Sequence, residues 1–232
     1  MIRRRWLLCL LVAIPVLVFG TACNKRGATT DTSLGKTLPV PESKAESGWP
    51  VYDVPAQGFA LALPPGWRQF DMNPKTFEAK FKEAIKQNPQ LESMKGSLQQ
   101  QITAGCKFMG IDQATVGTGF ATNVNVLRLL LPPGATLDMA AVETLSQLEI
   151  QPNVIKPIAH ERLKMTTGDR ERFRYRTTMM LPSGQKATLA ITQFVLLKDK
   201  DGYVVTLTTL PENEAKYAPT FDKIGESFRL TK

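Results

Sequence analysis

Four strand-length segments separated by three short turns occupy residues 154–210, and this pattern constrains the fold more than any other feature of the chain. The segments are Val154–Thr166, Arg170–Met180, Lys186–Leu197 and Tyr203–Leu210. The turns between them are Thr167-Gly168-Asp169, Leu181-Pro182-Ser183-Gly184 and Asp199-Lys200-Asp201-Gly202. Because connections this short join neighbouring strands as hairpins, the sequence predicts an antiparallel meander.

A helix is predicted ahead of the meander. Asn73 is a favourable N-cap and is followed by Pro74, which is well tolerated at the first helical position. Phe77, Phe81 and Ile85 then recur at every fourth position, which is the spacing of one helix face.

The other predicted elements surround the meander. A second apolar helical stripe ends at Gly105 and consists of Leu91, Met94, Leu98 and Ile102. Further strands are predicted at Tyr52–Val54, Phe59–Leu63 and Ala121–Leu131, and a further helix at Leu137–Ile150. A last helix places on one face Tyr217, Phe221, Ile224 and Phe228. Helices before, between and after antiparallel strands predict an α+β fold in which helices sandwich a sheet.

The first 22 residues have the organisation of an export signal. A basic start, Met1–Arg5, precedes the apolar run Trp6–Phe19, which is too short to span a bilayer. The run ends in Gly20-Thr21-Ala22-Cys23, which resembles the lipobox of bacterial lipoproteins, although that family prefers Leu where this chain has Gly20. We therefore predict a lipoprotein signal peptide over residues 1–22 and lipidation of Cys23. Ordinary cleavage after Ala22 and an uncleaved anchor are the alternatives.

Residues 23–49 are predicted to form a lipid-anchored flexible tether, because they are rich in polar residues, Gly and Pro. A flexible chain of this length has an end-to-end distance of about 28 Å. Residues 50–232 contain no further linker and are predicted to form one domain. Removal of the signal peptide lowers the net charge from +8 to +5.

The three cysteines and the single histidine restrict the chemistry that is available. Cys9 leaves with the signal peptide and Cys23 is predicted to carry lipid, so Cys106 has no disulfide partner. A nucleophile–base pair of Cys106 and His160 would need the two to be adjacent. We expect Cys106 to be a small buried apolar residue instead. No metal and no cofactor are predicted.

The first hairpin of the meander carries a row of basic residues. If the turn is Thr167-Gly168-Asp169, residue 166 pairs with 170 and residue 160 with 176. Period-two alternation then places seven basic side chains on one face. They are His160, Arg162, Lys164, Arg170, Arg172, Arg174 and Arg176. Because like charges opposite each other are destabilising, something must offset them.

Two interpretations of this basic face remain open. In the first, it binds an acidic protein surface, anionic headgroups or a small anion through Arg162, Lys164, Arg170, Arg172, Arg174 and Arg176. In the second, the face is solvated and is offset by the domain's own carboxylates, such as those of a covering helix. Nucleic acid is not expected, because no nucleic-acid module is present.

A family resemblance appears at both ends of the predicted domain. The segment Gly58–Trp67, GFALALPPGW, resembles the first strand and Pro-Pro-Gly-Trp turn of the Mog1/PsbP-like superfamily. The strand beginning Gly202-Tyr203 and the final helix resemble that superfamily's last strand and helix. The resemblance implies an α/β/α sandwich around an antiparallel sheet and a non-enzymatic binding or assembly role. It also favours a packing role for Trp67 over a contact role.

Together these observations predict an envelope lipoprotein, anchored in the cell membrane or outer membrane, that faces the periplasm or the cell exterior and binds a protein or an anionic surface. A stabilising subunit of a membrane complex, as in photosystems, is the alternative. A Cys106-dependent hydrolase is a third hypothesis, which predicts thiol-dependent activity.

Overall fold

The computed structural model describes residues 38–39, 48–70, 72–87, 89–181 and 185–231. The predicted signal peptide, Cys23 and most of the predicted tether lie outside the described residues. None of the helices within the described ranges is long and apolar enough to cross a membrane.

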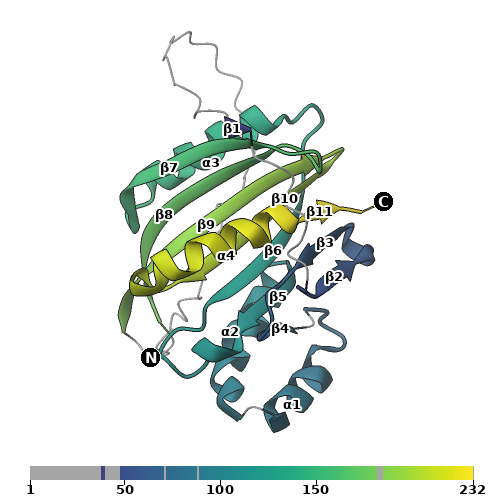
Figure 1. Ribbon diagram of the computed structural model, residues 1–232, viewed down its shortest axis with the longest axis vertical. Coiled ribbons are helices and arrows are strands. Elements are labelled where there is room, and N and C mark those ends of the chain that lie inside the picture. The colour runs from purple at the N-terminus through teal and green to yellow at the C-terminus, as the bar shows by residue number, and fades with distance from the viewer. Residues whose placement is uncertain (1–37, 40–47, 71, 88, 182–184, 232) are drawn as a thin grey trace, which may run out of the picture.

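An eight-stranded sheet runs through the domain in the order β1-β7-β8-β9-β10-β6-β5-β4 (Figure 1). Its strands are β1 Leu38–Pro39, β4 Trp67–Phe70, β5 Cys106–Asp112, β6 Asn123–Leu130, β7 Val154–Lys164, β8 Arg170–Met180, β9 Lys186–Lys198 and β10 Asp201–Thr209. All neighbours pair antiparallel except β1, which pairs in parallel with β7. The predicted meander is confirmed as β7–β10.

A small second sheet has the order β11-β3-β2. Its strands are β2 Val51–Val54, β3 Phe59–Ala62 and β11 Arg229–Leu230. The two strands predicted near the start of the domain are therefore present to within one residue. Since β11 follows the last helix, this sheet joins the beginning of the domain to its end.

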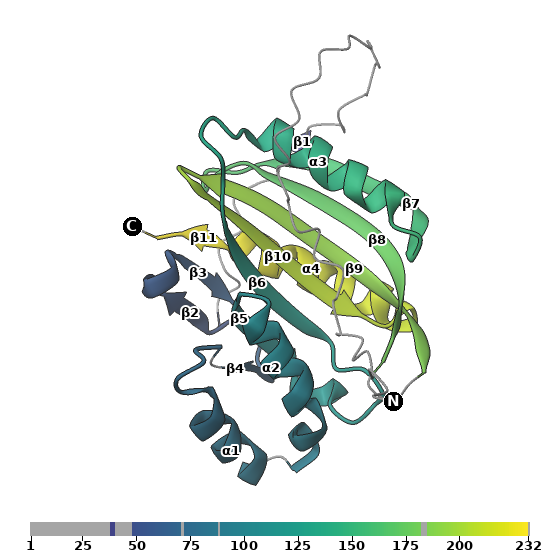
Figure 2. The ribbon, with the colours of Figure 1, turned by 180° about the vertical axis from the view of Figure 1, so that it is seen from behind.

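Helices cover both faces of the large sheet. The α-helices are α1 Phe77–Gln87, α2 Lys95–Thr103, α3 Leu137–Ile150 and α4 Glu214–Ser227. Short 3-10 helices are η1 Pro55–Gln57, η2 Pro89–Met94, η3 Gln113–Thr115 and η4 Pro211–Asn213. Helix α4 crosses one face in Figure 1, and α3 and α2 lie on the opposite face in Figure 2. The predicted α/β/α sandwich is confirmed.

The pleat of the strands divides the core into two apolar layers. One layer joins α4 and β3 to alternate residues of the sheet, such as Leu163 and Phe194. The other joins α1 and α3 to the residues between them, such as Phe173 and Val195. Because successive strand residues point to opposite faces, each apolar strand contributes to both layers.

The regular part of helix α1 begins at Phe77, three residues after Pro74. Asn73 still makes the contacts predicted for an N-cap: its side chain accepts from the Lys75 amide at 3.0 Å, and its carbonyl accepts from the Phe77 amide at 2.9 Å. The strands β4 and β5 are not predicted from the sequence, since the local pattern favours a turn at Trp67 and a helix–strand junction at Cys106. Strand β4 has only four residues, and β5 begins at Cys106, close behind helix α2, so the periodicity that would identify each strand is weak.

Candidate functional site

The register between β7 and β8 differs by three residues from the predicted one. Arg162 pairs with Glu171, and His160 pairs with Phe173. An odd shift exchanges the two faces of one strand relative to the other. The prediction that His160, Arg162 and Lys164 share a face with the arginines of β8 is therefore wrong.

The reason for this register lies in the turn and in the core. The connection extends over residues 165–169, and the Gly168 amide donates to the Met165 carbonyl at 3.0 Å. Leu163 pairs with Arg170 and is fully buried in the layer under α4. The predicted register would have placed this leucine on the opposite face.

On the α4 face, two arginines of β8 share two carboxylates. Asp222 of α4 accepts from Arg172 at 2.8 Å and from Arg174 at 2.6 Å. Glu161 of β7 accepts from Arg172 at 2.8 Å. On this face, arginines and carboxylates therefore alternate. This arrangement agrees with the second interpretation given above, in which the domain's own carboxylates offset the basic residues. Binding of an anionic partner by these arginines stays a prediction.

The two remaining arginines of β8 have different environments. Arg176 forms an ion pair with Glu214 at 2.7 Å. Arg170 is fully buried and donates to the carbonyls of Gly225, Phe228 and Gly168 and to the Thr167 hydroxyl. Burial lowers the pKa of Arg170 to about 10. Because it binds carbonyls at the C-terminal end of α4, Arg170 stabilises that helix end and cannot contact a partner.

On the opposite face, His160 and Arg162 converge on one buried carboxylate. Glu171 accepts from the His160 imidazole at 2.7 Å and also contacts Arg162, which reaches Asp138 of α3 as well. Burial by itself lowers the pKa of Arg162, but the hydrogen bonds to Asp138 and Glu171 outweigh it and raise the pKa. This cluster attaches α3 to the sheet. Lys164 is exposed and has no ion-pair partner among the described residues.

Cys106 and His160 do not form a catalytic pair. They lie on β5 and β7, which are five strand spacings apart, or roughly 24 Å at about 4.8 Å per spacing. Cys106 is buried, its thiol donates to the Phe108 carbonyl at 3.0 Å, and burial raises its pKa to about 11. The nucleophile–base hypothesis is therefore wrong, and the expectation of a buried Cys106 is confirmed.

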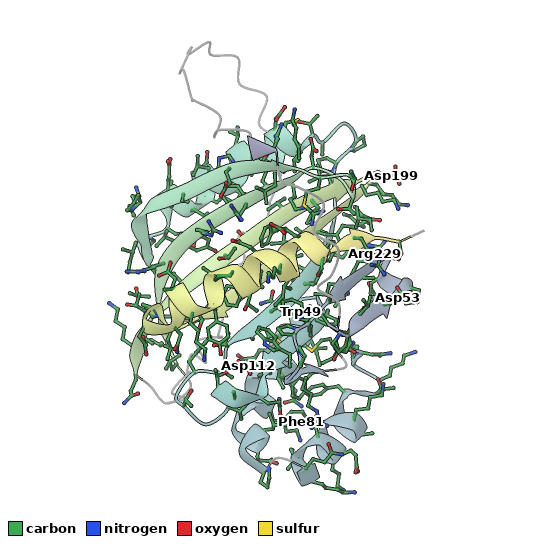
Figure 3. All side chains as sticks on the ribbon, in the orientation of Figure 1. Trp49, Asp53, Phe81, Asp112, Asp199 and Arg229 are labelled. Atoms are coloured by element: carbon green, nitrogen blue, oxygen red, sulfur yellow. The ribbon has the colours of Figure 1, made fainter. Side chains whose placement is uncertain are left out.

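Carboxylates are also dispersed. Asp53, Asp112 and Asp199 lie in separate parts of the molecule (Figure 3). Within the described ranges, no group of three or more His, Cys, Asp or Glu side chains is placed to hold a metal ion. Asp201 instead binds Arg128 at 2.7 Å.

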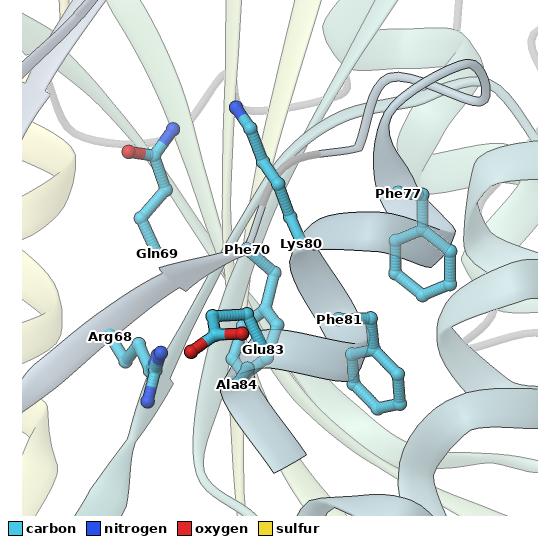
Figure 4. Close-up of a pocket in the computed structure, with 8 residues that line it drawn as sticks. All are labelled: Arg68, Gln69, Phe70, Phe77, Lys80, Phe81, Glu83 and Ala84. Atoms are coloured by element: carbon cyan, nitrogen blue, oxygen red, sulfur yellow. The ribbon is translucent and has the colours of Figure 1, made fainter. Parts of the chain in front are cut away.

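A pocket of about 430 Å³ lies between β4 and α1 (Figure 4). Its lining consists of Arg68, Gln69, Phe70, Phe77, Lys80, Phe81, Glu83 and Ala84. Phe70 and Phe81 form its apolar wall, with ring centroids 6.1 Å apart. The Glu83 carboxylate forms an ion pair with Lys86 at 2.9 Å. The pocket is not predicted from the sequence, because the local pattern does not identify β4.

Trp67 does not line this pocket. It is 8% exposed and packs in the apolar layer under α4, so its predicted packing role is confirmed.

A row of buried polar side chains crosses the centre of the large sheet on the face that carries α3. We call it the polar row; it consists of Gln193, Thr206, Asn125, Thr208 and Tyr175. Gln193 pairs with Thr206 and Thr206 pairs with Asn125 across three neighbouring strands. Thr208 lies two residues beyond Thr206 on the same face, and Tyr175 belongs to β8. All five are at most 4% exposed.

Most polar atoms of this row have no hydrogen-bond partner. The Gln193 amide nitrogen donates to Thr206 at 3.3 Å. The Gln193 carbonyl oxygen, both amide atoms of Asn125 and the hydroxyls of Thr208 and Tyr175 have no partner within the described part of the chain. Each unsatisfied group costs about 1–3 kcal/mol, so five approach the net stability of an ordinary domain, about 5–15 kcal/mol.

The sequence carries only a weak signal for this row. Asn125 stands in the apolar strand Asn123–Leu130, and Gln193 interrupts the apolar run of β9. A single amide in a strand is compatible with a solvated face. Only the strand order, which brings β9, β10 and β6 together, gathers these residues at one place.

Comparison with known proteins rests on structure, because no family model and no curated protein matches the sequence. Cyanobacterial PsbP (CyanoP) from Synechocystis sp. PCC 6803 has a TM-score of 0.50 at 14% identity, over 78% of this chain and 91% of that one.

Two further solved structures are similar at lower TM-scores. LpqN of Mycobacterium tuberculosis, described as involved in cell envelope biogenesis, has a TM-score of 0.48 at 9% identity, over 80% of this chain and 86% of that one. The Ran-binding protein Mog1p of Saccharomyces cerevisiae has a TM-score of 0.42 at 12% identity, over 80% and 96%. At these identities the likeness concerns the fold alone. The similarity to CyanoP confirms that this chain has a Mog1/PsbP-like fold.

Proposed function

We propose that this chain is an exported lipoprotein that holds a non-catalytic binding or assembly domain beside a membrane. The observation that carries the non-catalytic part is the separation of Cys106 from His160 by five strand spacings. His160 is bound to Glu171 and Cys106 to the Phe108 carbonyl, so neither is placed to act on a substrate. These contacts are compatible with a domain that acts by binding through its surface.

The membrane part of the proposal rests on the lipobox-like Gly20-Thr21-Ala22-Cys23. An acylated lipoprotein cysteine carries more than one chain, which is what stable anchoring requires. Leu38 pairs with Leu163 at the β7 edge of the sheet. Cys23 lies 15 residues before Leu38, so a lipid at Cys23 would lie within about 50 Å of the β7 edge.

The anchor is tested by metabolic labelling with a palmitate analogue and by detergent phase partitioning. We expect the unaltered chain to carry label and to enter the detergent phase, and Cys23→Ala to lose both properties. Cys9→Ala is the matched control, because Cys9 lies in the segment that is removed, and it should behave like the unaltered chain. Label that persists in Cys23→Ala would refute lipidation at this residue.

The binding part is tested by crosslinking of the tagged lipoprotein in native membranes, followed by mass spectrometry. A dominant protein partner is expected, and integral membrane subunits among the products would favour the stabilising-subunit alternative. Loss of the partner in Arg172→Gln combined with Arg174→Gln would assign the contact to the basic residues. A partner that is retained in this variant would place the contact elsewhere, and the absence of any partner would contradict a binding module.

A further inference from the structure

We infer that the open edge of strand β4, together with the pocket beside helix α1, binds an extended peptide segment of a partner protein that carries an acidic side chain. This inference rests on the binding part of the proposed function and names a place and a chemistry for the contact. It does not depend on the lipid anchor or on the arginines of β8.

Strand β4 is the last strand of the large sheet, and within the described residues only β5 pairs with it. Figure 1 shows β4 toward the lower end of the sheet, with α1 beyond it. An unpaired strand edge presents amide and carbonyl groups that can bond to an added strand. Strand β4 therefore offers a template for one more strand.

The hydrogen-bond pattern shows which groups of β4 face outward. The Gln113 amide donates to the Gly66 carbonyl at 3.1 Å, so these two residues are a hydrogen-bonded pair just ahead of β4. Bonded and non-bonded pairs alternate along an antiparallel ladder, so Trp67 and Gln69 are the residues whose backbone groups point away from β5. The Trp67 amide donates to the Pro64 carbonyl. Among the described residues, this leaves the Trp67 carbonyl and both backbone groups of Gln69 for a peptide.

The pocket of about 430 Å³ follows this edge (Figure 4). Arg68, Gln69 and Phe70 all line it, although successive strand residues point to opposite faces. A pocket that reaches three successive residues of one strand lies along the strand edge, where the backbone is within reach. Lys80 and Glu83 of α1 also line it, and both are exposed, as is Gln69, so the pocket is open to solvent.

The charges around the pocket favour an acidic peptide. Arg68 has no ion-pair partner among the described residues, and Lys80 is a second cation of the lining. Glu83, the carboxylate among the lining residues, forms an ion pair with Lys86. A carboxylate on the peptide would give the half-buried Arg68 a counter-charge, and salt screens such a contact less than one at an exposed surface.

The pleat sets the order of the peptide's side chains. Phe70 belongs to the apolar layer that contains α1, and Arg68, two residues earlier, lies on the same face. Peptide residues opposite Phe70 and Arg68 would point to this face as well. Antiparallel pairing is the more stable arrangement per residue, and in it the residue opposite Phe70 comes first. The site therefore selects an apolar residue followed two positions later by Asp or Glu.

A second copy of the chain is a less suitable occupant of this edge. Two β4 edges must pair through their outward-facing residues, and the register that uses both places Trp67 opposite Gln69 of the second copy. Arg68 then lies directly opposite Arg68 of the second copy. Like charges opposite each other are destabilising, so the basic edge favours an acidic partner over itself.

The first experiment titrates the full chain in detergent micelles with the probe acetyl-Ser-Val-Thr-Glu-Thr-Ser-amide, in which Val is intended to lie opposite Phe70 and Glu opposite Arg68. We expect saturable binding and a downfield NMR shift of the Gln69 backbone amide proton, because this amide gains a hydrogen bond. Methylation of the amide nitrogen of the Thr between Val and Glu should lower the affinity about tenfold, since this N–H donates to the Gln69 carbonyl. Methylation of the Glu amide nitrogen, which points away from β4, is the matched control and should change the affinity little.

Three results would overturn the inference. Equal losses from the two methylated probes, or binding without a shift of the Gln69 amide, would exclude strand addition. Dimerisation that shifts the same amide without any probe would replace the peptide by a second copy. Failure of the probe to bind would remove the site, whereas a crosslinked protein partner in native membranes would still support the proposed binding function.

The second experiment tests the charge contact. Arg68→Glu should weaken binding of the Glu probe about fivefold and should strengthen binding of a probe with Lys in place of Glu. The gain with the Lys probe also shows that the variant is folded. Arg229→Glu is the matched control, because Arg229 is an exposed arginine on β11, the edge strand of the small sheet, and it should leave both affinities unchanged. Equal affinities of the two variants for both probes would count against an acidic partner.

Discussion

Gly225 of α4 lies directly against the ring of Phe194 on β9, and a Cβ at position 225 would come within 2.1 Å of the Phe194 Cε2 atom. Phe194 is fully buried in the apolar layer under α4, so its ring can move only if its packed neighbours move as well. This close approach lets Asp222, one turn earlier in α4, reach the arginines of β8. It also places the Gly225 carbonyl where Arg170 donates to it. One missing side chain thus sets the position of the helix on which the ion-pair network depends.

Gly225→Ala is therefore expected to destabilise the domain by about 1–3 kcal/mol, because the added methyl group must displace a packed ring. Gly96→Ala is the matched control, since Gly96 also lies in a helix but a Cβ added there would meet nothing within 4 Å. This control should stabilise by about 0.5–1 kcal/mol through helix propensity. Urea unfolding of both variants measures the difference. Equal effects of the two substitutions would show that α4 does not approach Phe194 so closely.

Asp222→Asn is expected to cost roughly 2 kcal/mol, because two partly buried guanidinium groups lose the carboxylate that they share. The loss should be smaller at high salt, since screening weakens the contact in the unaltered chain. Asp199→Asn replaces a carboxylate in the β9–β10 turn and should change stability by less than about 0.5 kcal/mol. Chemical denaturation at low and high salt checks this. A loss from Asp199→Asn as large as that from Asp222→Asn would contradict the network.

The Cys106 thiol is expected to resist alkylation in the folded chain and to react once the chain unfolds. It is buried, and burial raises its pKa to about 11, so little thiolate exists near neutral pH. The stability contributed by the neutral thiol is fully present below about pH 9 and is lost as the pH rises through 11. Iodoacetamide labelling followed by mass spectrometry, with and without urea, provides the measurement. Rapid labelling of the folded chain would show that the Cys106 thiol in β5 is accessible to solvent and would contradict its burial.

Tyr217→Phe is expected to destabilise the domain by about 1–2 kcal/mol at neutral pH, because the Tyr217 hydroxyl donates to the buried Asp112 carboxylate. Burial, together with this hydrogen bond, raises the pKa of Tyr217 from 10.0 to about 12. The corresponding stability is complete below pH 10 and is lost as the pH rises through 12. Thermal unfolding between these pH values tests this. A decline of the same size in Tyr217→Phe would assign the pH dependence to another group.

Local patterns identified most elements of this fold. The turns at Thr167-Gly168-Asp169 and Asp199-Lys200-Asp201-Gly202 marked the hairpins of the meander, and the spacing of Phe77 and Phe81 marked one helix face. Such signals arise from residues that are near each other in the chain. The strands β4 and β5 were not predicted, because their own residues show little of the period-two alternation that identifies a strand.

The ion-pair partners of the β8 arginines could not be predicted from local sequence patterns. Glu161, Asp222 and Glu214 offset them, but two of these acids lie about 40 to 50 residues beyond the arginines in sequence. Their pairing depends on where α4 crosses the sheet. The β7–β8 register likewise depends on which face buries Leu163, and a shift by three residues reversed the predicted arrangement.

By itself, therefore, the sequence determined the antiparallel meander, the flanking helices and the export-signal pattern, because turn chemistry and periodicity are properties of neighbouring residues. The tertiary structure alone decided which charges meet, that Cys106 and His160 lie at a distance, and that Gln193, Thr206 and Asn125 form one buried row. Those relationships depend on strand order and on the packing of helices against a pleated sheet, which bring together residues that no local pattern connects.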